Sequence, residues 1–346
     1  MFFASDNAGP VHPKIMQRIV QANDGYAMPY GNDPIMEEVR AAIRDLFEAP
    51  QAAVYLVATG TAANALALAS YVQPYETVFC AQYSHIEEDE CNAPEFYMGG
   101  AKLTLIPTDN KMTPEALEAA IARRPHGGSV HMAQAGAVSI TQATEFGSVH
   151  TLDELRALTA VAKAANLPVH MDGARFANAL VSLGCTAADM TWKSGIDVLS
   201  FGGTKNGCMG VEAVVFFDHE KAWEFELRRK RGAHLFSKHR YLSAQMAAYL
   251  QDDLWLDMAN SANAACARLT TGLRSHGVQM VHEPQANMIF ARFKRGTHQR
   301  LKAAGAKYYV TDGDLDCGPA DALLTARLVC DWSMSTNSID QFLSHF

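Results

Sequence analysis

Apolar positions recur with two different spacings, which alternate along the chain from about residue 35 to residue 245. A spacing of three to four residues places apolar side chains on one helix face, and it predicts helices at 35–47, 62–71, 114–123 and 152–165. Short runs rich in β-branched and aromatic residues predict strands at 53–57, 77–80, 103–106, 129–133, 169–171, 198–201 and 213–217. This alternation predicts an α/β fold with a mostly parallel, seven-stranded sheet covered by helices on both faces.

The last hundred residues have a different pattern. A long helical stretch at 238–275 precedes strand candidates at 279–281, 288–293 and 324–330, and a last helix is expected near 338–345. We therefore expect a large domain, 1–245, followed by a small α+β domain, 246–346. The first 34 residues are rich in Gly, Pro, Asn and Asp, which predicts an irregular N-terminal arm.

Composition narrows the class of protein. The 346 residues are 49% hydrophobic and 19% charged, as in ordinary soluble globular proteins. A net charge of −8 argues against nucleic acid as a partner, and the basic run at 228–231 is better explained as a helix end or a phosphate site. No apolar stretch is long enough to cross a bilayer, and the N-terminus lacks a signal-peptide pattern, so we expect neither membrane association nor export.

The seven cysteines are scattered and form no Cys-x-x-Cys pair, which argues against a disulfide framework and against a zinc site. Reduced thiols in a cytoplasmic protein are the better interpretation. No His-Glu-x-x-His or comparable ligand set occurs, so we expect no catalytic metal.

Two of the predicted strands end in small and polar residues that carry an acid and an amine. The run at 169–171 leads into Asp172, and the run at 198–201 leads through two glycines and Thr204 to Lys205. A lysine amine that forms an imine, and a carboxylate that keeps a pyridinium nitrogen protonated, are the groups that a pyridoxal phosphate enzyme must supply. Asp172 alone could be a helix cap, and Lys205 alone a loop lysine; their joint occurrence at strand ends favours the cofactor.

Gly60, Thr61 and Ala62 follow a predicted strand and open a helix. Their backbone amides lack helical partners and would suit a phosphate, as would the Thr61 hydroxyl. The segment is neither Gly-x-Gly-x-x-Gly nor a P-loop, which disfavours a dinucleotide or ATP. Taken alone, it is equally consistent with a plain turn capped by Thr61.

Two further side chains follow predicted strands. His85 could stack on a pyridine ring or accept a proton, although a lone histidine is more often structural. Arg175 could bind a substrate carboxylate with two parallel hydrogen bonds, or form a surface ion pair. His131 and His170 lie within apolar runs and are expected to be structural.

In this order, these segments resemble the threonine aldolase family, in particular its low-specificity L-threonine aldolases, a branch of the fold-type-I pyridoxal enzymes. The matching segments are 5–7, 30–34, 58–64, 84–85, 170–175, 201–207 and 326–329. The resemblance implies an aspartate-aminotransferase-like large domain, pyridoxal 5'-phosphate as cofactor, and a homotetramer built from dimers with shared active sites. It implies cleavage of L-threonine, L-allo-threonine and related β-hydroxy amino acids to glycine and an aldehyde.

The same resemblance implies roles for individual residues. Lys205 would bind the cofactor covalently, Asp172 would hold the ring nitrogen protonated, and His85 would stack on the ring. The further cofactor-binding residues would be Gly60, Thr61, Ala62, Thr204 and Lys238, the last in place of an arginine common in relatives. The substrate-binding residues would be Ser5, Arg175, Arg327 and Tyr30, the tyrosine being lent across a dimer interface.

One segment departs from the family pattern. Relatives often have a histidine in an Asn-Thr-His-Asn type of loop that contacts the substrate hydroxyl, whereas residues 140–147 here contain none. His85 or a bound water remains as the base for the hydroxyl proton. An L-phenylserine aldolase, an aminotransferase or a β-eliminating lyase would share most of this site. A non-catalytic module that binds an amino acid is the alternative from another class, and the retained Lys205 argues against it.

Overall fold

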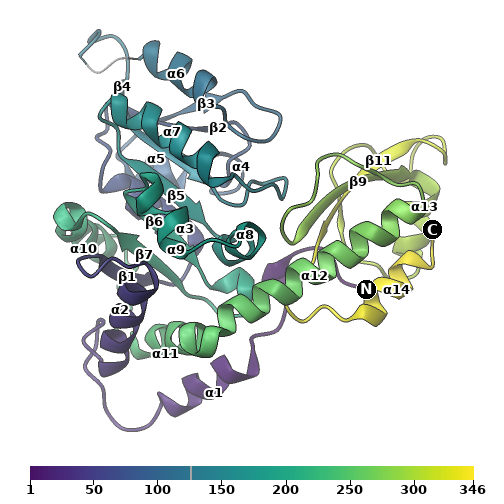
Figure 1. The fold of residues 1–346 in the computed structure, drawn as a ribbon, viewed down its shortest axis with the longest axis horizontal. Helices are drawn as coiled ribbons and strands as arrows, with labels where there is room; N and C mark the ends of the chain where they lie inside the picture. Colours follow the sequence, from purple (N-terminus) through teal and green to yellow (C-terminus); the bar gives the residue numbers. More distant parts are fainter. Residues whose placement is uncertain (125–126) are drawn as a thin grey trace.

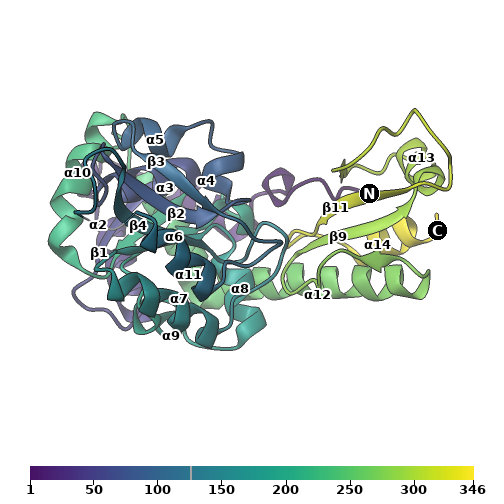
Figure 2. The ribbon, with the colours of Figure 1, turned by 90° about the horizontal axis from the view of Figure 1, so that it is seen from above.

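The chain forms two sheets, each with its own core. The computed structural model describes residues 1–124 and 127–346. A seven-stranded sheet has the order β1-β7-β6-β5-β4-β2-β3, and a four-stranded sheet has the order β10-β11-β9-β8. Figures 1 and 2 show the two sheets at opposite ends of the long axis, with helix α12 running from one to the other.

The large sheet confirms the predicted α/β fold. Its strands are β1 (Ala53–Val57), β2 (Glu76–Ala81), β3 (Lys102–Ile106), β4 (Gln134–Thr141), β5 (Val169–Gly173), β6 (Val198–Gly202) and β7 (Glu212–Phe216). The β6-β5-β4-β2-β3 part is parallel, whereas β7 pairs antiparallel with both β6 and β1. The sheet is therefore mostly parallel, as the alternation of helices and strands predicted.

One predicted strand, at residues 129–133, is wrong. Those residues form a turn, in which the Gln134 side chain donates to the carbonyls of Ser129 and Met132 at 2.9 and 2.8 Å. Such side-chain bonds to the backbone compete with a strand ladder. The fourth strand begins only at Gln134, and His131, expected in a strand, is exposed in the turn.

Helices cover both faces of the large sheet. They are α2 (Pro34–Leu46), α3 (Gly60–Ala69), α4 (His85–Glu88), α5 (Ala93–Tyr97), α6 (Pro114–Ala122), α7 (Leu152–Ala164), α8 (Phe176–Leu183), α9 (Ala187–Met190), α10 (Ala222–Arg231) and α11 (Arg240–Leu250). Neighbouring strand residues point to opposite faces. In β7, Val214 packs with α3 and α10, whereas Val215 belongs to the core that holds α2, α7 and α8.

Two helical expectations are corrected. The supposedly irregular arm contains α1 (Pro13–Gln21), whose Ile15 is fully buried. Its proline stands at the first helical turn, where the missing N–H costs nothing, so proline here starts a helix instead of breaking one. The single helix expected at 238–275 is two helices, α11 and α12 (Leu254–Ser275), because Asp252 and Asp253 adopt left-handed φ values of 52° and 54°.

The small sheet lies at the C-terminal end. It contains β8 (Gln279–Met280), β9 (Met288–Lys294), β10 (Tyr309–Val310) and β11 (Leu323–Val329), with helices α13 (Arg295–Ala303) and α14 (Thr336–Leu343). Along α12, Met258 packs in the large core and Leu269 in the small one. The division at residue 245 stays a prediction. Among the described residues, no helix is long and apolar enough to cross a membrane.

The N-terminus returns to the small sheet. Phe3 is fully buried in the small core, its amide donates to the Lys307 carbonyl at 2.7 Å, and its carbonyl accepts from the Val329 amide at 2.9 Å. The next residues form the short helix η1 (Asp6–Ala8). This path carries Ser5 and Asp6 to the boundary between the two cores.

Candidate active site

The strand ends that carry Asp172 and Lys205 lie at the same edge of the large sheet. In β5 and β6, Asp172 is level with Ser200. Because an added Cβ at Gly202 would sit 2.5 Å from the Ala174 carbonyl oxygen, only glycine allows the two strand ends to approach this closely. Lys205 follows in the short helix η3 (Thr204–Asn206), and its side chain is partly buried. The predicted juxtaposition of the two segments is therefore observed.

Hydrogen bonds with Tyr249 and Trp255 hold the loop that carries Lys205. Asn206 donates to the Tyr249 hydroxyl and to the Trp255 carbonyl, both at 2.8 Å, and the Tyr249 hydroxyl donates to the Gly202 carbonyl at 3.0 Å. These groups are buried. These bonds fix the backbone from which the Lys205 side chain extends. A covalent linkage to a cofactor would need such a fixed backbone.

Asp172 is buried and stays ionised. Its Oδ2 accepts from the Asn64 side chain and its Oδ1 from the Ala174 amide, at 2.9 and 3.0 Å. Burial raises the pKa of Asp172, but the positive charges of His85 and Lys205 outweigh it and bring the pKa below the ordinary value. The negative charge of Asp172 therefore lies close enough to Lys205 for the two side chains to interact.

A chain of hydrogen bonds connects His85 to Asp172. Nδ1 of His85 lies 3.0 Å from Oε1 of Glu90, and the Asn64 amide nitrogen bonds both Glu90 and Asp172 at 2.9 Å. The bond to Glu90 raises the pKa of His85, and burial raises the pKa of Glu90. The imidazole is thereby fixed at one edge, and its protonated form is favoured.

The first turn of α3 provides anion-binding donors. Thr59, and not Thr61, caps this helix, because its Oγ1 accepts from the Ala62 amide at 3.2 Å. The amides of Gly60 and Thr61 belong to the first turn and have no intrahelical acceptor. An added Cβ at Gly60 would meet nothing within 4 Å, so there is open space beside these donors. The turn thus has both the donors and the room for a phosphate.

Arg175 is held by a residue to which we assigned no role. Its Nε and Nη2 donate to the two carboxylate oxygens of Asp6, at 2.8 and 3.0 Å, and both side chains are buried. Burial raises the pKa of Asp6, but the Arg175 charge outweighs it and lowers that pKa. The pair leaves part of the guanidinium for another carboxylate.

Arg327 and Ser5 lie beside this pair. Arg327, in β11, donates to the Ala4 carbonyl at 3.3 Å; burial, with the nearby positive charge of Arg175, lowers its pKa. The Ser5 hydroxyl accepts from the Asn7 amide at 3.1 Å and caps η1. The structure therefore brings the arginines together at the boundary between the two cores, whereas Ser5 is at least partly used as a cap.

Two expected site residues, Tyr30 and Lys238, are exposed. Tyr30 is exposed, its ring lies 4.9 Å from the Lys230 ammonium, and its hydroxyl accepts from Ser237 at 3.5 Å. Lys238, next in sequence to Ser237, is also exposed. Within residues 1–124 and 127–346, no side-chain hydrogen bond or ion pair joins Tyr30 or Lys238 to the Lys205 cluster. Their roles stay predictions.

Several acids of the site were not foreseen as functional: Asp6, Glu90, Glu145 and Glu212. Glu212 lies beneath the Lys205 loop, accepts from the Gly203 amide at 2.8 Å, and has its pKa raised by burial to about 7. Asp6 belongs to a segment used in the family resemblance, but a short polar run does not tell which side chain is buried. Only the folded chain reveals that these carboxyls lie at the site.

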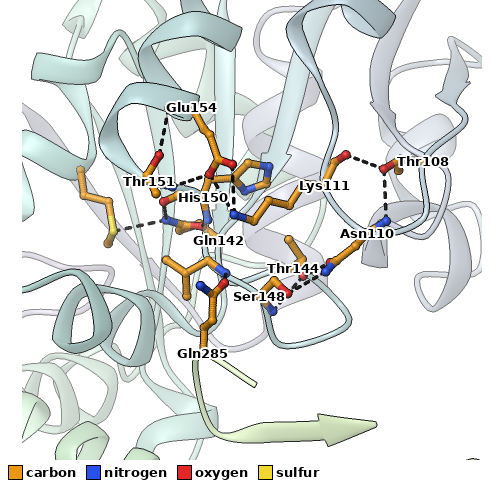
Figure 3. A network of polar contacts seen from close by, with 12 residues as sticks. Thr108, Asn110, Lys111, Gln142, Thr144, Ser148, His150, Thr151, Glu154 and Gln285 are labelled. Atoms are coloured by element: carbon orange, nitrogen blue, oxygen red, sulfur yellow. Dashed lines mark hydrogen bonds and ion pairs between the residues drawn. The ribbon is translucent and has the colours of Figure 1, made fainter. Parts of the chain in front are cut away.

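The loop that follows β4 is held by a polar network, drawn in Figure 3. Gln142 donates to the His150 carbonyl and accepts from its amide, both at 2.9 Å. Asn110 bonds Thr144 and Ser148 at 2.7 and 2.6 Å, and the Gln285 side chain accepts from the Val149 amide at 2.8 Å. The loop is therefore tied to the large sheet and to the segment before β9.

Replacing Glu90 by glutamine should lower the pKa of His85, because the carboxylate that favours the imidazolium is lost. The raised His85 pKa contributes stability that is fully present below the ordinary value of 6.5 and is lost as pH rises through the folded-state value. That pH dependence should weaken in the variant. NMR titration of the histidine and unfolding at several pH values measure both effects.

The exposed Glu88→Gln is the matched control for this change, since it removes the same charge three residues from His85. An unchanged His85 titration in Glu90→Gln would show that the hydrogen bond does not set the histidine's pKa.

The residues present fit a pyridoxal phosphate. The free amides at Gly60 and Thr61 would donate hydrogen bonds to its phosphate, and the ionised Asp172 would accept one from its protonated ring nitrogen. Asn64 lies one turn after Gly60 in α3, and its side chain donates a hydrogen bond to Asp172. The phosphate-type turn and the aspartate are therefore close together. The Lys205 amine would supply the covalent attachment.

Comparison with known proteins agrees with this geometry. The family model described as beta-eliminating lyase matches residues 3–295, and the chain belongs to this class of lyases. A low specificity L-threonine aldolase of Pseudomonas aeruginosa is 40% identical over 95% of this chain and 92% of its own, and that of a Pseudomonas species has the same values. The structure of Leishmania major threonine aldolase has a TM-score of 0.92 with 26% identity, covering 99% of this chain and 97% of its own.

Within the lyase class, the chain belongs to the threonine aldolase family. The fold-type-I assignment is thereby confirmed together with the family.

Proposed function

We propose that this protein cleaves L-threonine and L-allo-threonine, and related β-hydroxy-α-amino acids, to glycine and an aldehyde, with pyridoxal 5'-phosphate as cofactor. The observation that carries the proposal is the convergence of Lys205, the ionised Asp172 and the open first turn of α3 at one edge of the sheet. The names of the Pseudomonas relatives support the same activity and substrate class.

The chain's own groups account for the orientation that the reaction needs. When bound, the cofactor supplies the electron sink for the carbanion left at Cα. Asp172 would keep its ring nitrogen protonated, and His85, whose imidazole Glu90 fixes, would contact the ring. Arg175, which Asp6 positions, and Arg327, which bonds the Ala4 carbonyl, would bind the substrate carboxylate and so orient the substrate.

A product assay tests the function. The purified holoenzyme should release glycine with acetaldehyde from L-threonine and from L-allo-threonine, and glycine with benzaldehyde from phenylserine. A strong preference for phenylserine would mark an L-phenylserine aldolase. A keto acid or ammonia as the main product would contradict the proposal and would indicate an aminotransferase or a β-eliminating lyase instead.

We further propose that the protein is a homo-oligomer, a dimer of dimers, whose active sites take Tyr30 from a second copy. The support is an exposed group of large apolar residues on neighbouring segments: Tyr26, Met28, Tyr30 and Phe236. Sedimentation should give a mass of four chains. Tyr30→Ala should raise KM for threonine and leave cofactor binding in place; a fully active monomer would refute the arrangement.

We place the protein in the cytoplasm. Support comes from its seven cysteines, all of which are free thiols in the structure, as expected for a reducing compartment.

A further inference from the structure

The loop after β4 carries an acid whose position is set by the backbone. Its first residue, Gln142, donates its amide to the Asp172 carbonyl at 2.8 Å, so the loop leaves the sheet directly beside the site's central carboxylate. The Gly147 carbonyl then accepts from the Gln285 amide at 3.1 Å. Glu145 lies between these two anchors, at the boundary of the two cores.

Aromatic contacts fix the same segment from the side. Phe146 lies edge-to-face against Tyr83 at 5.2 Å between ring centroids, and against Phe290 of β9 at 5.1 Å. Tyr83 is two residues from His85, so the loop also borders the histidine turn. Together with the polar network of Figure 3, these contacts leave the backbone of Glu145 little freedom.

The two anchors place the Glu145 segment beside Asp172 and the Tyr83–His85 turn. The ionisation of Glu145 responds to Lys205, Arg175, His85 and Asp172, and its charge in turn acts on Arg327. Such mutual effects require proximity, because the field of a charge falls with distance. Glu145 therefore lies on a loop that borders Asp172 and the turn that carries His85.

Glu145 differs from the other acids of the site in having no fixed partner. Asp6, Glu90, Asp172 and Glu212 each accept hydrogen bonds from protein groups. In the part of the chain that the structure describes, the Glu145 carboxylate takes part in no hydrogen bond or ion pair. It also lines a cavity of about 20 Å³ with Ser84 and His150. Among the described residues, no protein donor therefore occupies its carboxylate oxygens.

Resting on the proposed function, we propose that Glu145 accepts the β-hydroxyl proton of the substrate as the Cα–Cβ bond breaks. The hydroxyl O–H bond breaks, and the proton passes to a carboxylate oxygen of Glu145. The O–H electron pair becomes the second bond of the aldehyde C=O, and the Cα–Cβ pair stays on Cα. Glu145 then occupies the role that the missing loop histidine leaves open.

The electrostatics agree with this assignment. Burial raises the pKa of Glu145 from its ordinary value, which makes its carboxylate a stronger proton acceptor. His85 is a weaker candidate, because the bond to Glu90 raises its pKa and favours the form that already carries the proton.

The test separates two reactions of the same holoenzyme. Glu145→Gln should lower kcat/KM for L-threonine cleavage about a hundredfold, the scale of a lost general base. The same variant should exchange the α-proton of glycine with D2O at the wild-type rate, since glycine has no β-hydroxyl. Its affinity for pyridoxal phosphate, titrated by fluorescence of the apoprotein, should be unchanged. NMR follows the exchange, and Glu118→Gln on the exposed face of α6 is the control.

Wild-type cleavage by Glu145→Gln would overturn the inference, as would a parallel loss of glycine exchange and cofactor affinity. A wild-type protein that neither cleaves threonine nor exchanges glycine would instead refute the proposed function. Glutamine has the shape of glutamate, and a thermal unfolding midpoint equal to that of the wild type establishes that the fold is intact.

Discussion

Lys205→Ala is expected to lose covalent cofactor binding and to reduce threonine cleavage by about 10⁴-fold or more, since the substitution removes the amine proposed to hold the cofactor. No nearby lysine offers a substitute in the described residues of this loop, where Gly203, Thr204 and Asn206 flank the position. The loop itself should keep its shape, because Asn206 and Tyr249 hold it through groups that the substitution leaves in place. The loss is therefore chemical and not a consequence of unfolding.

Borohydride reduction of the loaded protein, followed by mass spectrometry of its peptides, measures the attachment directly. The wild type should carry the added mass on the peptide with Lys205, and the variant should carry none. Lys221→Ala, at an exposed position, is the matched control and should behave like the wild type. Near-normal glycine release from threonine by Lys205→Ala would sink the assignment.

Asp172→Asn should reduce cleavage by about a thousandfold, the equivalent of about 4 kcal/mol of lost charge stabilisation in a buried site. Asparagine keeps the size of the side chain and can still accept from Asn64 or Ala174, so the local packing should survive. It cannot carry the negative charge that keeps a ring nitrogen protonated. The change therefore isolates the charge from the shape.

Two measurements decide this prediction. Turnover of L-threonine gives the size of the effect, and the nitrogen-15 shift of labelled cofactor bound to each protein reports whether its ring nitrogen is protonated. Asp45→Asn, on the exposed face of α2, is the control. A variant with a protonated ring nitrogen and full activity would show that Asp172 does not serve the cofactor.

The strands were the most predictable part of the fold, although β4 was misplaced and the short β10 was not predicted. Strands β5, β6 and β7 are buried along their whole length because both faces of the sheet are covered, and the apolar residues that dominate such strands are visible in one dimension. β4 was misplaced because its small residues resemble a turn. Gly136 is needed there, since an added Cβ would lie 2.9 Å from the Cβ of Glu76 on β2. A close approach of two strands has no signature in sequence.

The helix boundaries show a related limit. The break between α11 and α12 depends on left-handed backbone at Asp252 and Asp253, and the apolar period continues through it. Likewise, α1 lies within a segment rich in turn-forming residues, which did not indicate a helix. In both cases local residue types indicated one structure, and packing against α2, α8 or α11 decided for another.

By itself, the sequence indicated a lysine and an aspartate at the ends of two predicted strands, and a turn suited to a phosphate at the start of a predicted helix. Those residues are local in the chain, and the edge they share follows from parallel pairing. Only the tertiary structure decided which other groups surround them. Asp6 reaches Arg175 across 169 residues, and Asn64 reaches Asp172 across 108. Such contacts arise only when segments far apart in the chain pack together, and no local pattern of residues encodes them.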